Sequence, residues 1–466
     1  MYDVYIKSKL DYRKEQIMEK ADIIVVGGSA AGLTAGITAR RHYPDKEILL
    51  VRMEKQVLIP CGIPYIFGTV ESPQKNLVGD AVLEKNNIEL LIAEATDIDR
   101  EGKVLHTTEG DVGYERLIIA TGSRPAMPPI PGFDLDGVYA VVKDVEYLSG
   151  LQQRLETVED VVVIGGGFIG IELGDEINKA GDKTVTIVEI LPHCLALAYD
   201  EEFCVEMEKV LESRGINIRT SSRVDKIDGD GKVERVILSD GSEIKADVVI
   251  LGIGAVANVD LAQRAGLRIG LTGSIAVDRT MQTSDENIYA CGDCGEKISF
   301  FGGRPSPLKL ASIATLEARI AGANLFGIRR ENIGTVGVWS TAVGDTALAT
   351  AGLTEEMARQ RGYDAVAATI AGPNRHPGLM PGAANTRVKL VFERNSGVIL
   401  GGQVMGGPAA GEVINAISAC VQNRMTAEDI AMFQTGTHPA LTASPIAYHM
   451  VNAAEMAIKQ MRERGG

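Results

Sequence analysis

The sequence lacks any apolar run long enough to cross a membrane, and it contains few cysteines. Charged residues occur throughout residues 1–20, where a secretory signal would need an apolar core. The six cysteines are scattered over 466 residues, which excludes a disulfide framework. We therefore expect a cytoplasmic protein without membrane contact, in which a reactive cysteine indicates catalysis rather than a structural bridge.

The chain also lacks an excess of positive charge. Its formal net charge is −15, and an acidic surface of this kind argues against nucleic acid as a partner. With 45% hydrophobic residues, 23% charged residues and 52 glycines, the composition is that of a glycine-rich globular protein. A chain of this length is expected to divide into about three domains.

The first glycine-rich turn follows a short apolar strand that begins at Asp22. Its residues are Gly27-Gly28-Ser29-Ala30-Ala31-Gly32. A helix and a second strand over residues 47–52 follow, which is the order of a nucleotide-binding βαβ unit. The backbone N–H groups of such a turn bind a pyrophosphate, although Ser29 stands where the usual middle glycine would be. Glu54, just beyond the second strand, is either a ribose-binding carboxylate or a solvated charge at the strand end.

A second and complete fingerprint begins 138 residues later, with Gly165-Gly166-Gly167-Phe168-Ile169-Gly170 after an apolar strand. Glu189 closes the next strand, 19 positions after Gly170, and can accept hydrogen bonds from ribose hydroxyls. Its charge would repel a 2′-phosphate, so we expect NADH to be preferred over NADPH. Two such units on one chain indicate two nucleotides, a bound flavin and a diffusing nicotinamide.

Cys61 follows the first unit, in Ile59-Pro60-Cys61-Gly62-Ile63-Pro64-Tyr65. Most cysteines are small buried hydrophobes. A thiol among backbone-restricting residues and close to a dinucleotide indicates redox chemistry instead.

A third motif, Thr283 to Asp293, contains a polar turn, a short apolar strand and Gly292-Asp293. Taken in order with the Ala120-Thr121-Gly122 turn and the two fingerprints, it resembles the FAD-dependent pyridine nucleotide-disulfide oxidoreductases over residues 22–460. The resemblance implies an α/β fold with two Rossmann-like nucleotide-binding domains, as in glutathione reductase, and a C-terminal α+β dimerisation domain. The implied divisions are an extension over 1–20, an FAD domain over 21–145 and 267–332, an NAD domain over 146–266, and a dimerisation domain over 333–466.

The resemblance also implies the cofactor-binding residues. For FAD these are Gly27, Ser29, Ala30, Ala31, Gly32, Glu54, Ala120, Thr121, Gly122, Gly292 and Asp293. For the nicotinamide nucleotide they are Gly165, Gly167, Phe168, Ile169, Gly170, Glu172, Glu189 and Gly254. Asp293 would bind the flavin ribityl chain, Phe168 would gate the nicotinamide pocket, and Glu172 would lie near both rings. No metal site is expected, because Cys291 and Cys294 flank the flavin motif as packing residues.

Further absences narrow the resemblance. Dithiol members carry a second cysteine five residues after the first, where this chain has Ile66. Cys61 therefore resembles the single-cysteine branch, which includes coenzyme A disulfide reductases, NADH-dependent persulfide or polysulfide reductases and NADH oxidases. These enzymes cycle one thiolate through a mixed disulfide, persulfide or sulfenate. Related peroxidases have a histidine in the first glycine turn, and Ala30 and Ala31 argue against that activity.

Two further sites stay open at this point. Arg40 and Arg41 resemble an arginine pair of coenzyme A disulfide reductases that holds substrate phosphates, but cations at a helix end also simply complement its dipole. His438 resembles the acid–base histidine that dithiol reductases lend across the dimer. Its usual glutamate partner is replaced by Ala443, and without a carboxylate to orient its ring His438 is a weaker candidate acid.

We therefore expect a homodimeric flavoenzyme that passes electrons from NAD(P)H through FAD and Cys61 to a small sulfur acceptor. Coenzyme A disulfide, persulfide and polysulfide are the expected acceptor classes, with the Cys61 pKa lowered to favour the thiolate. The alternatives are an NADH oxidase that reduces dioxygen and a flavin-bearing electron-transfer partner of another protein.

Overall fold

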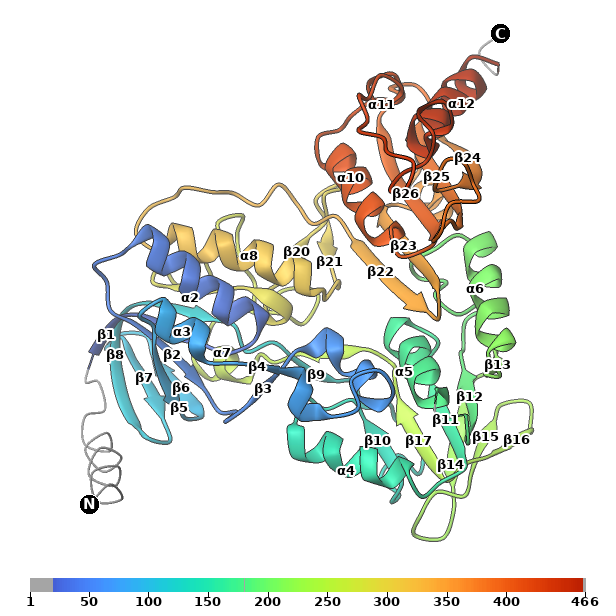
Figure 1. The fold of residues 1–466 in the computed structure, drawn as a ribbon. Helices are drawn as coiled ribbons and strands as arrows, with labels where there is room; N and C mark the ends of the chain where they lie inside the picture. Colours follow the sequence, from blue (N-terminus) through green and yellow to red (C-terminus); the bar gives the residue numbers. More distant parts are fainter. Residues whose placement is uncertain (1–19, 180, 464–466) are drawn as a thin grey trace, which may run out of the picture.

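The computed structural model describes residues 20–179 and 181–463, which form three large sheets of seven, five and five strands (Figure 1). The expected α/β fold, with two Rossmann-like units and a C-terminal α+β unit, is confirmed. Within the described residues, no helix has both the length and the apolar character needed to span a bilayer.

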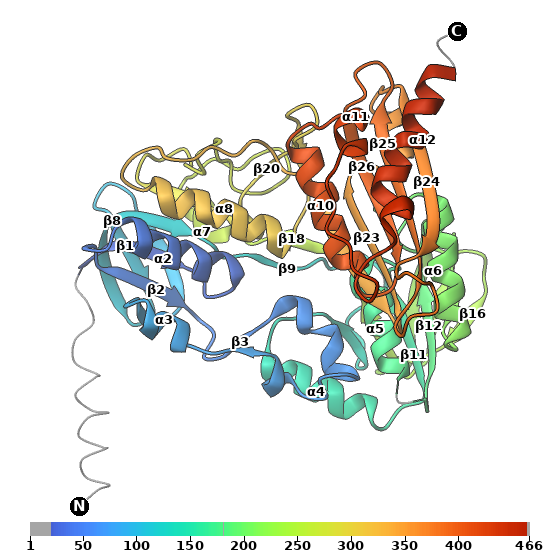
Figure 2. The ribbon, with the colours of Figure 1, turned by 45° about the horizontal axis from the view of Figure 1, so that its top comes forward.

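The first sheet has the order β5-β2-β1-β8-β7-β6, and β19 pairs with β8. Helices α2 and α8 lie side by side on it (Figure 2). Gly322 of α8 allows their close approach, since a Cβ there would lie 2.6 Å from the Ala35 carbonyl oxygen of α2. The strands are β1 Lys20–Val26, β2 Ile48–Arg52, β5 Glu89–Ile92, β6 Ala95–Asp99, β7 Val104–Thr107, β8 Gly110–Ile119 and β19 Ile288–Ala290. The helices are α2 Ala30–His42, α3 Ala81–Lys85, α7 Asp260–Arg264 and α8 Ala311–Asn324.

The second sheet is parallel throughout, in the order β10-β17-β11-β12-β13. Its strands read as nearly continuous apolar runs because helices cover them. They are β10 Val138–Ala140, β11 Asp160–Ile164, β12 Thr184–Val188, β13 Asn217–Arg219 and β17 Val248–Leu251. The helices are α4 Val145–Leu155, α5 Phe168–Asn178 and α6 Glu201–Ser213, and a small antiparallel sheet is formed by β14 Val224–Asp228, β15 Arg235–Leu238 and β16 Glu243–Lys245.

Two crossing strands connect these units. Strand β9, Ser123–Pro125, pairs antiparallel with β18, Ala255–Ala257, so the chain enters and leaves the second unit through one narrow ribbon. Strand β10 already belongs to the second sheet although it precedes the expected division at residue 145, and α7 packs on β6 of the first sheet although it precedes residue 267.

The third sheet is antiparallel, in the order β22-β23-β26-β25-β24. Its side chains alternate between two cores: Ala347 and Ala349 face α10 and α12, whereas Leu348 faces α6 of the second unit. The strands are β22 Val338–Val343, β23 Thr346–Gly352, β24 Ala365–Pro373, β25 Asn385–Glu393 and β26 Ile399–Gly406. The helices are α9 Glu355–Gln360, α10 Ala410–Gln422, α11 Ala427–Ala431 and α12 His449–Glu463.

Residues 57–78 leave the first unit and contact the second, and we call them the Cys61 segment. The segment opens and closes with a short antiparallel pair of strands, β3 Val57–Leu58 and β4 Leu77–Val78. Between them are the 3₁₀ turns η1 Pro60–Gly62, η2 Pro64–Phe67 and η3 Pro73–Asn76, each with proline at its start.

A buried polar network joins the second unit to the third sheet. Asp200, which precedes α6, lies 2.9 Å from the Lys389 ammonium of β25, and its backbone N–H donates to Gln403 of β26 at 2.8 Å. Lys389 also contacts Glu202 at 2.6 Å and Glu355 at 3.0 Å. Because Asp200 and Lys389 are each about 6% exposed, neither charge can turn to water if the other is removed.

We therefore expect Lys389→Met to lower the free energy of unfolding by about 3–5 kcal/mol, because it leaves Asp200 buried without its cation. Denaturant unfolding would measure this. Lys75→Met is the matched control, since its pair with Glu71 is exposed and such pairs contribute about 0–1 kcal/mol. Equal losses in the two variants would contradict the role of the network.

The network also makes stability depend on pH. Burial alone would raise the pKa of Asp200, but hydrogen bonds from Lys389 and Gln403 outweigh it and hold the pKa below its usual value. The stabilisation is thus present above the unfolded pKa of about 4 and is lost as the pH falls through the lower folded value. Thermal unfolding should show the gap between wild type and Lys389→Met narrowing as the pH falls below about 4.

Candidate active site

The first glycine turn fits between β1 and α2 because two of its glycines lie against backbone atoms that leave no room for a side chain. Gly27 adopts φ +118°, and a Cβ there would collide with the Ala120 carbonyl oxygen. A Cβ on Gly32 would collide with the carbonyl oxygen of Gly27. These contacts set the start of α2 at the carboxyl ends of β1 and β8.

The second glycine turn repeats this packing between β11 and α5. Gly165 adopts φ +108°, and a Cβ there would lie 2.6 Å from the Gly252 carbonyl oxygen. A Cβ on Gly170 would collide with the Gly165 carbonyl. Gly167 differs, because a Cβ there would have no described atom within 4 Å. This side of the turn is open to a ligand.

Both helices behind the turns begin without a side-chain cap. In the described chain, Ser29 forms no cap hydrogen bond at the start of α2, which opens with the small residues Ala30 and Ala31. Gly167 precedes α5, whose second residue, Ile169, is exposed. Neither helix has an acidic residue in its first turn. The first backbone N–H groups are therefore available to phosphates, and the residues present fit the two dinucleotides.

Glu189 lies directly against the second glycine turn. Its carboxylate accepts hydrogen bonds from the backbone N–H groups of Gly166, at 2.6 Å, and Leu191, at 2.7 Å. Only 8% of the residue is exposed, so these bonds fix the negative charge beside the turn. Gly254 lies in the open turn after β17, with φ +101°. The arrangement agrees with a ribose-binding role for Glu189, which stays a prediction.

The equivalent position of the first unit is different. Glu54 is exposed in the turn after β2. The buried side chain is that of Arg52, which donates to both carboxylate oxygens of Asp80 at 2.8 and 2.9 Å and to the Glu54 carbonyl at 2.9 Å. Arg52 also supports the turn, because a Cβ on Gly28 would collide with it. Sequence reasoning missed this arginine, since a charged residue ending an apolar strand gives no sign of burial.

The Ala-Thr-Gly turn lies beside the Gly-Asp motif. The Thr121 hydroxyl donates to the Asn258 carbonyl at 2.8 Å, and the Asn258 amide donates back to the Thr121 carbonyl at 2.9 Å. Gly122 follows with φ +70° and no described atom within 4 Å of a Cβ position. The Ser123 hydroxyl then donates to the Asp293 carboxylate at 2.7 Å. Parallel strands β8 and β19 place both motifs at one edge of the sheet.

A buried ion pair supports the Gly-Asp motif from behind. Gly292 adopts φ +77°, and a Cβ there would lie 2.7 Å from the Ala31 Cβ of α2. The Gly292 N–H donates to Glu317 of α8 at 3.0 Å, and Lys297 lies 3.4 Å from the same carboxylate oxygen. Burial raises the pKa of Glu317 to about 7. Nothing in the local sequence indicates this pair.

The turn that carries Cys61 is held by Asn76. The backbone N–H of Ile59 donates to the Asn76 carbonyl at 2.9 Å, and the Asn76 side-chain amide donates to the Ile59 carbonyl at 3.0 Å. A Cβ on Gly62 would collide with the Asn76 side chain. Of the six cysteines, all within the described residues, Cys61 alone is exposed. Ile66, where a second redox cysteine would stand, is fully buried.

Helix α5 joins the second unit, which we call the nicotinamide unit, to the Cys61 segment. Glu176 accepts hydrogen bonds from the Thr69 N–H at 2.7 Å and from the Lys179 ammonium at 2.6 Å. One turn earlier, Glu172 accepts a hydrogen bond from the Thr341 hydroxyl of β22 at 2.8 Å. Burial raises the pKa of Glu172 to about 7, although the Thr341 hydroxyl acts in the opposite direction.

The comparisons with known proteins agree with this geometry. The profile of the pyridine nucleotide-disulphide oxidoreductases matches residues 21–318, and the profile of their dimerisation domain matches residues 338–448. The chain belongs to this family. The family predicted from the ordered motifs is therefore confirmed.

Relatives are named for two activities. The chain is 30% identical over 453 residues to an NADH oxidase of Methanocaldococcus jannaschii, covering 95% of this chain and 99% of the relative. It is 33% identical over 395 residues to the NAD(P)H coenzyme A polysulfide/persulfide reductase of Pyrococcus horikoshii, covering 83% and 88%. The structure of an NAD-dependent persulfide reductase from A. fulgidus matches with a TM-score of 0.88 and 33% identity, covering 95% of this chain and 84% of that one.

The Cys61 thiol of this oxidoreductase does not have the expected lowered pKa. Although the side chain is exposed, the surrounding protein raises the pKa of Cys61, first by removing water and then through the charge of Glu172. Lys143 lowers it, and Asp293 raises it further. The expectation of a lowered pKa is wrong for this arrangement, because desolvation and two carboxylates outweigh one lysine.

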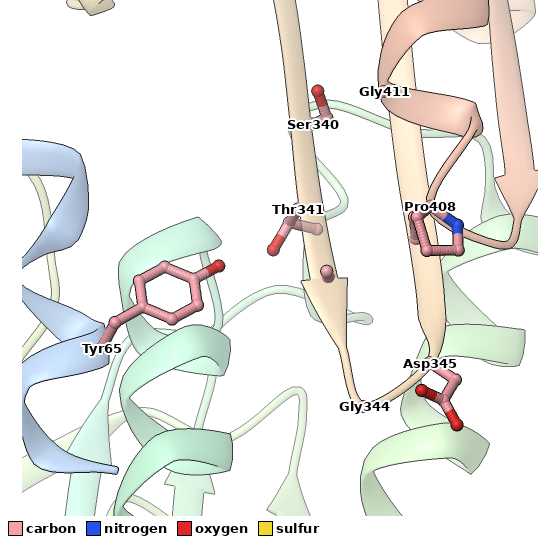
Figure 3. Close-up of a pocket in the computed structure, with 9 residues that line it drawn as sticks. Tyr65, Ser340, Thr341, Gly344, Asp345, Pro408 and Gly411 are labelled. Atoms are coloured by element: carbon pink, nitrogen blue, oxygen red, sulfur yellow. The ribbon is translucent and has the colours of Figure 1, made fainter. Parts of the chain in front are cut away.

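A cavity of about 280 Å³ lies between the Cys61 segment and the C-terminal unit (Figure 3). In Figure 3 the Tyr65 ring points from η2 toward Thr341 on β22. The lining residues are Tyr65, Ser340, Thr341, Ala342, Gly344, Asp345, Ala347, Pro408 and Gly411. Phe168, the expected nicotinamide gate, packs edge-on against Trp339 of β22, with ring centroids 5.9 Å apart, and lies 6.0 Å from the Tyr199 ring.

Arg40 is held by the backbone rather than left open for a ligand. Its guanidinium donates four hydrogen bonds of 2.6–3.1 Å, to the carbonyl groups of Pro44, Lys46, Asn86 and Asn87. These bonds tie the end of α2 to two turns, which favours a structural role for Arg40. Arg41 is exposed, and a phosphate contact there stays a prediction.

His438 lies in an exposed turn between α11 and α12. The ring Nδ1 of His438 accepts a hydrogen bond from the backbone N–H of Ala440 at 3.2 Å. The backbone N–H of His438 donates to the Thr442 hydroxyl at 3.0 Å. An accepting Nδ1 leaves the proton on Nε2. Ala443, at the position of the missing glutamate, is buried. A catalytic role for His438 across a dimer stays a prediction.

Gly62→Ala tests how the Cys61 turn is held. We expect the new Cβ to displace Asn76, to lower the free energy of unfolding by about 1–3 kcal/mol and to change the rate of iodoacetamide labelling at Cys61. Gly79→Ala, just beyond the Cys61 segment, is the control, because its Cβ would have no described atom within 4 Å. If both variants label and unfold like wild type, Asn76 does not hold the turn.

Proposed function

We propose that this protein is an FAD-dependent enzyme that passes electrons from NADH through Cys61 to a sulfur acceptor such as coenzyme A disulfide, a persulfide or a polysulfide. The observation that carries the proposal is the position of Cys61. It is the one exposed cysteine in the described chain, and the carboxylates of Glu172 and Asp293 act on its thiol. Those two residues belong to the nicotinamide unit and the flavin unit, so Cys61 lies where both units meet.

The two units supply the binding sites. In the flavin unit, the Gly27 turn and the uncapped start of α2 would bind the pyrophosphate, while Thr121 and Asp293 would lie along the rest of the cofactor. In the nicotinamide unit, the open side of Gly167 and the fixed carboxylate of Glu189 would bind NADH. FAD, when bound, supplies the transfer of two electrons from NADH to the sulfur centre.

Cys61 has no cysteine partner, so its oxidised state must contain sulfur or oxygen from the substrate. As a thiolate it attacks one sulfur of a disulfide RSSR, a new Cys61–SR bond forms, and the original bond breaks to release RS⁻. Two electrons then cleave Cys61–SR, releasing the second RS⁻ and restoring the thiolate, and two protons from solvent convert both products into thiols. The buried Ile66 prevents an internal disulfide from competing.

The relatives support this acceptor class. The Pyrococcus horikoshii and A. fulgidus proteins are named for persulfide reduction, and each match extends over more than four fifths of this chain. The matched dimerisation domain supports a homodimer, in which His438 would face the active site of the partner subunit.

NADH oxidation by dioxygen is a second candidate. The Methanocaldococcus jannaschii relative carries that name, and the match covers 99% of its length. Cys61 would then alternate between thiol and sulfenic acid. Comparing NADH consumption with dioxygen, coenzyme A disulfide, polysulfide and peroxide as acceptors separates the candidates.

Cys61→Ser tests the proposed thiol step. A hydroxyl cannot form a mixed disulfide or persulfide, so we expect loss of sulfur-acceptor reduction by at least about a thousandfold, while NADH still bleaches the flavin. Stopped-flow absorbance measures flavin reduction by NADH and reoxidation by the sulfur acceptor separately. The first half-reaction is the internal control, and reoxidation of the variant at the wild-type rate would disprove the mechanism.

Glu189→Gln tests nucleotide choice. Removing the negative charge should raise kcat/KM for NADPH relative to NADH by about tenfold, because the repulsion of the 2′-phosphate is lost. Glu159→Gln is the control, since that exposed residue lies just before β11, at the other end of the same sheet. An unchanged ratio in Glu189→Gln would show that the carboxylate only holds the glycine turn.

A further inference from the structure

The one tryptophan of the chain lies against the start of α5. The ring of Trp339, from β22 of the C-terminal unit, packs edge-on against Phe168, with centroids 5.9 Å apart and ring planes at 88°. Phe168 is the first residue of α5 and directly follows the second glycine turn. Its ring also lies 6.0 Å from that of the buried Tyr199. A residue of the C-terminal unit therefore contacts the part of the nicotinamide unit where a nucleotide would bind.

Further contacts fix the direction of β22 along α5. Two residues along the strand, the Thr341 hydroxyl donates to Glu172 at 2.8 Å. At the end of the strand, the backbone N–H of Gly344 donates to Asp175 at 3.4 Å. The contacted positions of α5 are four and three residues apart, so they lie on one face of the helix. The indole is thus held by a strand that follows this helix and not by a single ring contact.

Gly337 makes room for the indole. A Cβ on Gly337 would collide with Cζ3 of the Trp339 ring and would lie 2.7 Å from Cη2. These atoms belong to the six-membered ring, at the end of the indole that is far from Nε1. The same Cβ position lies 3.3 Å from Leu308, which precedes α8 of the flavin unit. Trp339 therefore lies where the C-terminal, nicotinamide and flavin units meet.

The indole N–H of Trp339 has no acceptor within the described residues. Nε1 is buried, yet no atom of that part of the chain accepts its hydrogen bond. An indole nitrogen can only donate, and buried tryptophans usually donate to a partner. Because an unpaired buried donor is unfavourable, an acceptor supplied by a bound ligand would stabilise this arrangement.

In the proposed function a nucleotide binds beside this N–H. Its adenosine end would lie at Glu189 and its pyrophosphate at the start of α5. The nicotinamide end must reach the flavin unit for hydride transfer, so it extends away from Glu189 toward the junction at Trp339. The carboxamide at that end carries an oxygen that can accept a hydrogen bond from an N–H group.

We propose that Trp339 belongs to the nicotinamide-binding site: its indole N–H donates to the carboxamide oxygen of the nicotinamide, and its ring holds Phe168 at the start of α5. The proposal rests on the proposed function, because it requires a nicotinamide nucleotide at the second glycine turn. It gives the C-terminal unit a direct part in binding the nucleotide of its own chain, in addition to assembly.

The test compares the binding of NAD⁺ and of ADP-ribose to the FAD-loaded enzyme by isothermal titration calorimetry. ADP-ribose carries every part of NAD⁺ except the nicotinamide. Trp339→Phe keeps an aromatic ring but removes the N–H, so we expect NAD⁺ to bind about fivefold more weakly. ADP-ribose should bind to this variant as it binds to wild type.

Trp339→Leu removes the aromatic ring as well, and it should weaken NAD⁺ binding by at least about tenfold. Phe326→Leu is the matched control. The Phe326 ring also packs edge-on, against Tyr43 with centroids 5.0 Å apart, but it lies in the flavin unit. This control should bind both ligands like wild type.

The emission of Trp339 gives a second measurement, which needs no substitution. Since the chain has one tryptophan, the emission of the FAD-loaded wild type reports on this position alone. We expect NAD⁺ to change the emission more strongly than ADP-ribose does, because only NAD⁺ brings a nicotinamide to the indole. Equal responses to the two ligands would overturn the proposal.

The calorimetric results separate the two proposals. If wild type binds both ligands and Trp339→Phe binds NAD⁺ equally well, only the role of Trp339 is wrong. The same holds if the variant loses affinity for both ligands to the same extent, since that loss indicates a general disturbance of the site. If wild type binds neither ligand, the proposed function is wrong and the role of Trp339 falls with it.

Discussion

Both nucleotide-binding units depend on the same close contact between backbone atoms. In each turn the last glycine packs against the carbonyl of the first, and the first packs against the end of a neighbouring strand, Ala120 in one unit and Gly252 in the other. A single methyl group at either position would separate strand from helix. Because the helix start must lie at the carboxyl edge of the sheet to reach a phosphate, this contact sets where each turn could bind one.

Helix α5 extends this constraint to the thiol. It begins at the nicotinamide turn, and further along it binds the Cys61 segment through Glu176 and the C-terminal unit through Glu172. One rigid element thus relates nucleotide, thiol and third sheet. A helix in this position can transmit a change at any one of the three to the others without a long series of intermediate contacts.

The features that could be predicted from the sequence are local ones. The glycine turns, the Gly292-Asp293 motif and the restricted Cys61 turn are each encoded within a few consecutive residues, where glycine, proline and strand patterns fix the backbone. Parallel strands β1, β8 and β19 bring the first glycine turn, the Ala-Thr-Gly turn and Gly292-Asp293 to one edge of the first sheet.

Contacts between distant residues could not be predicted in this way. Arg52 with Asp80, Asn76 with Ile59, and Thr341 with Glu172 join positions 28, 17 and 169 residues apart, and no local pattern marks either partner. The direction of the Cys61 pKa shift failed for the same reason, since it depends on carboxylates brought from α5 and from the turn after β19.

The pairing of β8 with β19 has a consequence for how the chain is made. Leu117 and Ile288 are partners in this sheet although 171 residues separate them, and the whole second unit lies between them. On the ribosome, residues 117–119 of β8 therefore stay unpaired on one side until the second unit has emerged. Because a strand edge of that kind can pair wrongly, early folding of the inserted unit shortens the time for which β8 is at risk.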